Sequence, residues 1–291
     1  MSSILRLDHQ TTYRYASLVN ASYNEARMTP ASTQAQVTLA QMTLEASLQV
    51  EPATDLYTYW DYFGTLVHCF DLQAPHDELT VHSSAVVETG LVQGTFPPAP
   101  SWDDLMSPAL LDRHCEYLLP SPLTQPDETL AGLADEIRTS SPDPKAALSK
   151  VLEVIDERMA YQKGVTDTTT TASTALHLGR GVCQDYAHVA IALLRLTGIP
   201  ARYASGYFHH HRNAGIGEVV IGESHAWIEA WLGDWIGMDP TNAVPVGSWH
   251  VLVGRGRDYR DVAPLRGIYS GGPSVAATTE VKIVLLGEGG S

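Results

Sequence analysis

The chain has 291 residues, 44% of them hydrophobic, which suffices for a sizeable core in one large domain or two unequal ones. Its formal net charge of −15 argues against nucleic acids and anionic membranes as partners, because binding to their phosphate groups requires lysine and arginine. Apolar stretches such as residues 283–286 fall far short of the roughly 20 residues that a membrane-spanning helix needs.

The first ninety residues are predicted to form strands. Polar and apolar residues alternate with a period of two in three segments, 4–15, 37–50 and 79–87. Two more strand-like runs, 57–61 and 66–72, flank Phe63-Gly64-Thr65, which is typical of a hairpin turn. Strands at short spacing, with no helical pattern between them, predict an antiparallel, sandwich-like β module over residues 1–95.

A proline-rich break at residues 96–100 (Phe-Pro-Pro-Ala-Pro) marks the expected domain boundary, since proline lacks an N–H and restricts the residue before it. Beyond the break the apolar period becomes helical over four segments, 104–119, 127–138, 143–159 and about 182–196. Six strand-like runs follow, at 201–208, 218–221, 225–232, 235–238, 250–253 and 279–286. A helical block followed by a mainly antiparallel sheet predicts an α+β domain over residues 96–291.

The three cysteines, Cys69, Cys115 and Cys183, are too few for a disulfide framework and belong to no cluster with zinc-ligand spacing. Residues 1–6 also lack the basic segment and apolar run of a secretory signal. We therefore expect free thiols, no metal and a cytoplasmic location. Cys69 inside a strand and Cys115 inside a helix are expected to be inert.

Cys183 lies where the loop 179–182 (Gly-Arg-Gly-Val) becomes a helix. The N–H groups of a first helical turn lack intrahelical partners and carry partial positive charge. They stabilise a thiolate and can hold the oxyanion that forms when the thiolate attacks a carbonyl. The same position also suits a small buried hydrophobic residue, the common role of a free cysteine. Position therefore makes Cys183 a candidate nucleophile.

His225 begins a strand in which Trp227, Glu229 and Trp231 share its face. A histidine beside bulky aromatic side chains can be held in a partly dry cleft, where it can act as a base. Asp239 ends a short apolar strand, so its carboxylate can accept the second imidazole N–H and fix the tautomer. Asp239 can also be a plain turn residue before a proline. The joint occurrence of the cysteine, the histidine and the aspartate favours a catalytic triad.

Four segments, in this order, resemble the bacterial transglutaminase-like superfamily: 181–188 (GVCQDYAH), 198–207 (GIPARYASGY), 224–227 (SHAW) and 239–242 (DPTN). The first ninety residues resemble the N-terminal region that accompanies this core in bacteria. That likeness rests on 13–15 (YRY), 61–64 (DYFG) and 75–79 (PHDEL), and departs at Thr65, where the pattern has asparagine.

The resemblance implies a papain-like α+β catalytic core after the β module, with a triad on Cys183, His225 and Asp239. Tyr161 lies upstream of a threonine-rich loop, where related enzymes place a residue near the oxyanion. Gln184 supplies the N–H after the nucleophile, although its side chain can simply face solvent.

Three further features of the sequence bear on the expected cleft. His188, about one helical turn after Gln184, can line the cleft or make a structural hydrogen bond, and the second role is favoured. Trp227 can contribute an aromatic wall. Residues 209–211 (His-His-His) fit a solvated loop better than a metal site, because adjacent residues of a strand point in opposite directions.

The resemblance implies a cysteine-dependent amide or peptide hydrolase that works through a thioester acyl-enzyme on Cys183. Transfer of the acyl group to an amine is the alternative, as in a true transglutaminase or a ligase. A non-catalytic binding protein, recognising partners through the β module, is a third possibility. We expect a peptide or amide substrate and no cofactor. Calcium dependence finds no support, since no acidic loop with suitable ligand spacing occurs. Substrate identity and oligomeric state stay open.

Overall fold

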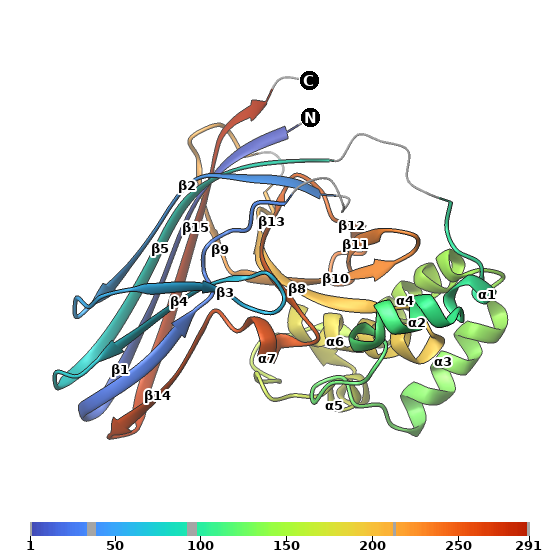
Figure 1. The fold of residues 1–291 in the computed structure, drawn as a ribbon, viewed down its shortest axis with the longest axis horizontal. Coiled ribbons are helices and arrows are strands. Elements are labelled where there is room, and N and C mark those ends of the chain that lie inside the picture. The colour runs from blue at the N-terminus through green and yellow to red at the C-terminus, as the bar shows by residue number, and fades with distance from the viewer. Residues whose placement is uncertain (1, 34–38, 92–97, 212–213, 290–291) are drawn as a thin grey trace.

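The computed structural model describes residues 2–33, 39–91, 98–211 and 214–289. A large β-sheet stands at one side of the molecule, the helices gather at the other, and a smaller sheet lies between them (Figure 1). One apolar cluster, which includes Leu5, Val251 and Ile283, joins the two sheets. A second cluster, which includes Ile191 and Ile228, joins the helices to the smaller sheet. This arrangement confirms the predicted α+β class.

The large sheet is built around one long strand. It comprises β1 (Ser2–Ala26), β2 (Leu39–Glu51), β3 (Tyr57–Trp60), β4 (Leu66–Leu72), β5 (His76–Leu91), β9 (Val219–Gly222), β14 (Leu265–Gly271) and β15 (Ser274–Gly289). The first half of β1 pairs with β5 and β15, and the second half pairs with β4 and β14. The predicted hairpin appears as β3 and β4, with Gly64 at φ 78° in the turn. That angle favours glycine because it has no Cβ.

The C-terminal strands correct the predicted organisation. The expected catalytic domain covers residues 96–291, whereas β9, β14 and β15 of that range belong to the large sheet. The predicted sandwich-like module is a single curled sheet, whose apolar cluster is completed by side chains of the smaller sheet. Alternation reveals which face of a strand is buried but not which strand lies beside it. Residues 96 and 97 of the predicted break lie outside the described residues.

The smaller sheet has the strand order β12-β11-β10-β8-β13. Its strands are β8 (Ala201–Phe208), β10 (Ser224–Trp231), β11 (Trp235–Asp239), β12 (Val244–Pro245) and β13 (His250–Gly256). All described pairings of this sheet are antiparallel, so the end of β8 lies between the start of β10 and the start of β13. Four of these five strands, all except β12, match predicted runs. The end of β8, the start of β10, the end of β11 and the start of β13 lie at the same edge of the sheet.

Three predicted helices are confirmed as α3 (Glu128–Ser140), α4 (Pro144–Arg158) and α6 (Cys183–Thr197). The helix predicted over 104–119 is wrong: that region holds α1 (Trp102–Leu105), α2 (Pro108–Arg113) and a 3₁₀ turn (Cys115–Tyr117). Pro108 explains the break, because a proline forces its predecessor into extended backbone, here Ser107 at ψ 137°.

Other short elements were not predicted. They are α5 (Ala172–Leu178), α7 (Tyr259–Val262) and the parallel pair β6 (Ala160–Tyr161) and β7 (Arg180–Gly181). The side chain of Thr171 caps α5 by accepting the N–H of Thr174 at 3.2 Å. Across the described part of the chain, no helix is both long enough and apolar enough to cross a bilayer.

Candidate active site

Cys183 is the first residue of α6, as the sequence predicted. The helix start is held by Asp185, whose Oδ2 accepts the N–H of Val182 at 2.8 Å and the hydroxyl of Thr166 at 2.7 Å. Gly181 makes this cap possible, since a Cβ there would lie 2.4 Å from that carboxylate oxygen. Gly181, two residues before Cys183, therefore leaves room for the cap at the start of the helix that carries the thiol.

His225 and Asp239 meet at one edge of the smaller sheet. His225 lies near the start of β10 and Asp239 ends the antiparallel neighbour β11, which brings Nε2 to 2.7 Å from Oδ2. Asp239 is fully buried. Its Oδ1 accepts the backbone N–H groups of Thr241 and Asn242 at 3.0 and 3.2 Å. The Asn242 side chain donates to Oδ2 at 2.7 Å. The predicted turn before the proline thus exists, and it also anchors a carboxylate on a histidine.

The charges of this cluster favour an imidazolium at His225. Burial alone would lower the pKa of His225, but hydrogen bonds with Asp239 and Cys183, together with their negative charge, raise it to about 9. Burial would raise the pKa of Asp239, yet hydrogen bonds from His225, His250 and Asn242 hold it well below its usual range. Because Nε2 of His225 faces Asp239, Nδ1 is the nitrogen left for Cys183. The arrangement suits a thiolate–imidazolium pair.

The raised pKa of His225 predicts a pH-dependent stability. A histidine normally titrates near 6.5, so the folded state binds this proton more tightly than the unfolded state. The resulting stabilisation is complete below pH 6.5 and is lost as the pH rises through about 9. We expect the free energy of unfolding of the wild type to lose about 3 kcal/mol more over this interval than that of His225→Gln.

Urea denaturation between pH 6 and 10 measures this difference. His177→Gln is the control, because His177 lies on α5 with 58% of its side chain exposed. The control should follow the wild-type curve. If the free energy of unfolding changes with pH in the same way in wild type and His225→Gln, the folded state does not bind the proton of His225 more tightly than the unfolded state.

Two cavities, of about 370 and 590 Å³, meet at Cys183 and His225. Tyr161, Lys163 and Glu223 line both of them. Lys163 and Glu223 form an ion pair at 2.6 Å, with their side chains 62% and 65% exposed. Exposed ion pairs contribute little to stability, so this contact can open at small cost. The two cavities thus share Cys183 and His225, and a weak ion pair lies among the residues that line both.

The comparisons with known proteins decide the family. The model for the transglutaminase-like superfamily matches residues 131–240, and the model for the bacterial transglutaminase-like N-terminal region matches residues 5–88. The chain belongs to the transglutaminase-like superfamily. Each model matches the half of the chain in which the sequence resemblance was seen. The match to the superfamily core includes Cys183, His225 and Asp239.

Similar proteins include two that resemble this chain in sequence and one that resembles it in structure. The uncharacterized protein ML0607 of Mycobacterium leprae is 42% identical over 282 residues, which cover 97% of this chain and 99% of that protein. A protein-glutamine gamma-glutamyltransferase of Pseudomonas aeruginosa is 30% identical over 119 residues, or 38% of this chain and 18% of that protein.

The third similarity is structural. The crystal structure of a candidate cysteine protease from Cytophaga hutchinsonii superposes with a TM-score of 0.76 at 23% identity, covering 100% of this chain and 93% of the other. At that identity the likeness shows a shared fold. It extends over both sheets and the helices, so the large sheet is part of the architecture that the two proteins have in common.

The other predicted cleft residues of this transglutaminase-like core divide into two groups. Tyr161 is half exposed and lines both cavities. Gln184 lines the smaller cavity, but its side chain is buried and donates to the carbonyl of Asp167 at 3.3 Å, so it does not simply face solvent. His188 and Trp227 are fully buried and line neither cavity.

His188 and Trp227, which do not line the cavities, have packing roles instead. Nε2 of His188 accepts the N–H of Tyr259 at 3.2 Å, and burial lowers the pKa of His188 to about 4. This is the structural hydrogen bond that the sequence analysis favoured. Trp227 stacks behind His225 with ring centroids 6.3 Å apart. The predicted solvated loop at 209–211 is wrong for His209, which is fully buried against the ring of Trp249.

Sequence reasoning missed His250, whose Nε2 lies 3.3 Å from Oδ2 of Asp239. Candidate metal-ligand atoms of His225, Asp239 and His250 lie within 4.8 Å of one another. The carboxylate is already engaged by both rings through hydrogen bonds, which is the geometry of a positioned aspartate rather than of three free ligands. The sequence signal was weak, because His250 is one of 12 histidines and no motif surrounds it.

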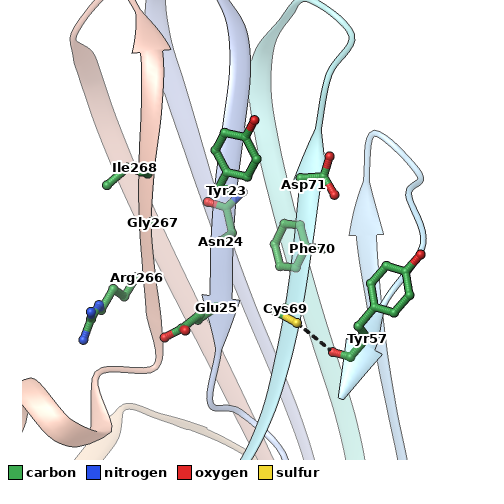
Figure 2. A pocket seen from close by; sticks show the side chains of 10 residues that line it. All are labelled: Tyr23, Asn24, Glu25, Tyr57, Cys69, Phe70, Asp71, Arg266, Gly267 and Ile268. Carbon is green, nitrogen blue, oxygen red and sulfur yellow. Dashed lines mark hydrogen bonds between the residues drawn. The ribbon is translucent and has the colours of Figure 1, made fainter. Parts of the chain in front are cut away.

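The other two cysteines of this superfamily member lie in different surroundings. A groove of about 460 Å³ on the large sheet, between β1, β3, β4 and β14, is lined in part by Cys69 (Figure 2). The thiol of Cys69 donates to the carbonyl of Tyr57 at 3.4 Å. Cys115 is exposed in the 3₁₀ turn. Cys183 is therefore distinguished by its helix start and by its contact with His225, and all three are free thiols.

Proposed function

We propose that this chain is a cysteine-dependent amide or peptide hydrolase, with Cys183 as nucleophile, His225 as proton carrier and Asp239 as the residue that orients His225. The observation that carries the proposal is the geometry: Nε2 of His225 lies 2.7 Å from the buried carboxylate of Asp239, and His225 lines the same cavities as Cys183. The raised pKa of His225, about 9, agrees with these contacts. A histidine held in this way beside a thiol can take the thiol proton and later pass it to a leaving amine. Membership of the transglutaminase-like superfamily supports acyl chemistry at that thiol.

The proposed reaction has two halves. In the first, the thiolate attacks the amide carbonyl, and backbone N–H groups at the start of α6 stabilise the oxyanion. His225 gives its proton to the departing amine as the C–N bond breaks, which leaves a thioester on Cys183. In the second half, neutral His225 takes a proton from water while the oxygen of that water attacks the thioester. The C–S bond then breaks, which releases the acid and restores the thiolate–imidazolium pair.

Alkylation of thiols with iodoacetamide tests this proposal without a known substrate. Cys115 is the most exposed of the three thiols, so accessibility alone would make it react first. We expect Cys183 to react about tenfold faster than Cys115 at pH 7, because His225 lies beside it as a base and Cys115 has no such partner in the proposed mechanism. In His225→Ala this advantage should disappear. Peptide mapping by mass spectrometry gives the rate for each cysteine, with Cys69 as an internal control.

Equal alkylation of all three cysteines in the wild type would contradict the proposal. It would leave the third possibility considered for this sequence, a binding protein whose Cys, His and Asp do not turn over a substrate. An advantage of Cys183 that survives in His225→Ala would instead assign the activation to the helix start alone. The two outcomes therefore point to different revisions.

The two cavities favour a second candidate function, transfer of the acyl group to an amine. A hydrolase needs room for one substrate and a water, whereas a transferase must admit a second substrate to the thioester. Cavities of about 370 and 590 Å³, both lined by Cys183, can hold an acyl donor and an acceptor. The similarity to a protein-glutamine gamma-glutamyltransferase supports the same reading.

Hydrolysis and transfer are separated by the fate of one glutamine-containing peptide. The peptide is incubated with a labelled primary amine, and ammonia release is compared with incorporation of the label. Ammonia without label supports the hydrolase, whereas equal amounts of both support the transferase. Cys183→Ala supplies the blank for each readout.

A further inference from the structure

His250 is the first residue of β13 and is almost fully buried, with 2% of its surface exposed. The strand order places it beside the end of β8, where it pairs with Phe208. The start of β10 and the end of β11 lie at the same edge of the sheet. Four strands therefore bring His225, Asp239, Phe208 and His250 together, although the last is 11 residues beyond Asp239 in the chain.

The hydrogen bonds of His250 define its tautomer. The backbone N–H of Gly247 donates to Nδ1 at 3.1 Å, so that nitrogen accepts and carries no proton. In the neutral ring the proton then resides on Nε2, which faces Oδ2 of Asp239 at 3.3 Å. Burial, outweighing the nearby carboxylate, lowers the pKa of His250. His250 is therefore a neutral donor to the same carboxylate oxygen that holds His225.

Aromatic packing holds the two imidazole rings in place. Phe208 contacts both, with ring centroids 5.3 Å from His225 and 4.5 Å from His250. Trp227 presents its ring to His250 at 5.4 Å in an edge arrangement. The titratable groups that act on His250 are Asp239 on β11 and His225 on β10. Neither ring can turn without displacing a large buried side chain, so the donor direction of His250 is fixed.

We propose that His250 is a second positioning histidine, which donates from Nε2 to Asp239 and keeps the carboxylate aimed at His225. The inference rests on the proposed function, since it assigns His250 to the machinery that activates Cys183. Oδ2 receives donors from His225, His250 and Asn242. Loss of one donor lets the buried carboxylate turn toward the remaining partners. The hydrogen bond between Asp239 and His225 then weakens, and the carboxylate stabilises the protonated ring of His225 less.

The experiment compares the pH profile of Cys183 alkylation in wild type, His250→Phe and His250→Gln. Phenylalanine keeps the packing against Phe208 and Trp227 but removes the donor, whereas glutamine supplies an amide N–H. We expect His250→Phe to react about tenfold more slowly at pH 7, as for other residues that orient a reacting group. Its alkaline limb, where His225 loses its proton, should move to lower pH. His250→Gln should restore both rate and profile.

A matched control removes another buried histidine of the same domain. His114 packs against Trp231 with ring centroids 4.9 Å apart and lines neither cavity at Cys183. His114→Phe should keep the wild-type profile. An unchanged profile in His250→Phe overturns the inference. A shift to higher pH also overturns it, because His250 would then compete with His225 for the carboxylate instead of positioning it.

A measurement on the wild-type protein covers the case in which His250→Phe does not fold. Nitrogen-15 NMR of labelled histidines distinguishes the two tautomers, and the spectrum of His250→Gln assigns the signals. We expect His250 as the neutral Nε2–H form, and finding the Nδ1–H form overturns the inference. The proposed function fails separately, when wild-type Cys183 reacts no faster than Cys115.

Discussion

Replacing Cys183 with alanine is expected to abolish turnover, with kcat/KM lowered by about 10⁴-fold or more. The reason is that no bond to the substrate can form, while the backbone of the first turn of α6 and both cavities stay in place. An activated ester such as 4-nitrophenyl acetate provides the assay, since it acylates reactive thiols without a matched leaving group. Release of nitrophenol is followed with time, and the acetyl adduct is located by mass spectrometry.

Cys69→Ala and Cys115→Ala are the matched controls, because each removes a thiol that lies outside the cavities at Cys183. Both should stay within about twofold of the wild type, since surface or distant substitutions rarely alter a site. Residual turnover in Cys183→Ala near the wild-type level would assign the reaction to another group. An acetyl adduct on Cys115 alone would reject Cys183 as nucleophile.

Replacing Glu229 with alanine is expected to destabilise the fold by about 3–5 kcal/mol. Glu229 is buried in β10 and accepts hydrogen bonds from Arg202 at 2.5 Å and Arg255 at 2.7 Å. Burial would raise the pKa of Glu229, but the charges of Arg255 and Arg202 lower it to about 2. Removal of the carboxylate leaves two guanidinium groups close together and largely out of water, which is the costly part.

Urea denaturation at pH 7 measures the loss. Glu153→Ala is the matched control, since Glu153 pairs with Lys150 on the exposed face of α4 at 3.0 Å. Exposed pairs contribute less than about 1 kcal/mol, so the control should stay close to the wild type. A loss in Glu229→Ala no larger than in the control would mean that water reaches both arginines and replaces the carboxylate.

Local sequence signals account for most of the candidate site. Cys183 could be predicted because a helix start is visible in the Gly-Val-Cys pattern and in the apolar period that follows. For His225 and Asp239 the strand position is a weak signal, and the segments 224–227 and 239–242, which resemble the transglutaminase-like superfamily, made both predictable. Their hydrogen bond at 2.7 Å needs only that consecutive strands pair, which is the commonest arrangement in antiparallel sheets.

His250 and the C-terminal strands could not be predicted in the same way. The position of His250 depends on β13 lying beside β8, a pairing between strands that are not consecutive. The period of β15 is visible, but its partner β1 lies at the other end of the chain. By contrast, the break in the helix predicted over 104–119 could have been predicted, because Pro108 is visible in the sequence and disfavours helical backbone at Ser107.

The pairing of β1 with β15 has a consequence for how the molecule is made. Ser2 lies opposite Gly289, so this side of β1 stays unpaired until β15 has been synthesised. The helices and β8, β10, β11 and β13 can pack together earlier, because all of them are complete before β15 is synthesised. Contacts between such distant segments form slowly. A chain that stops short of β15 would leave β1 with an open edge, which is prone to pair with other chains.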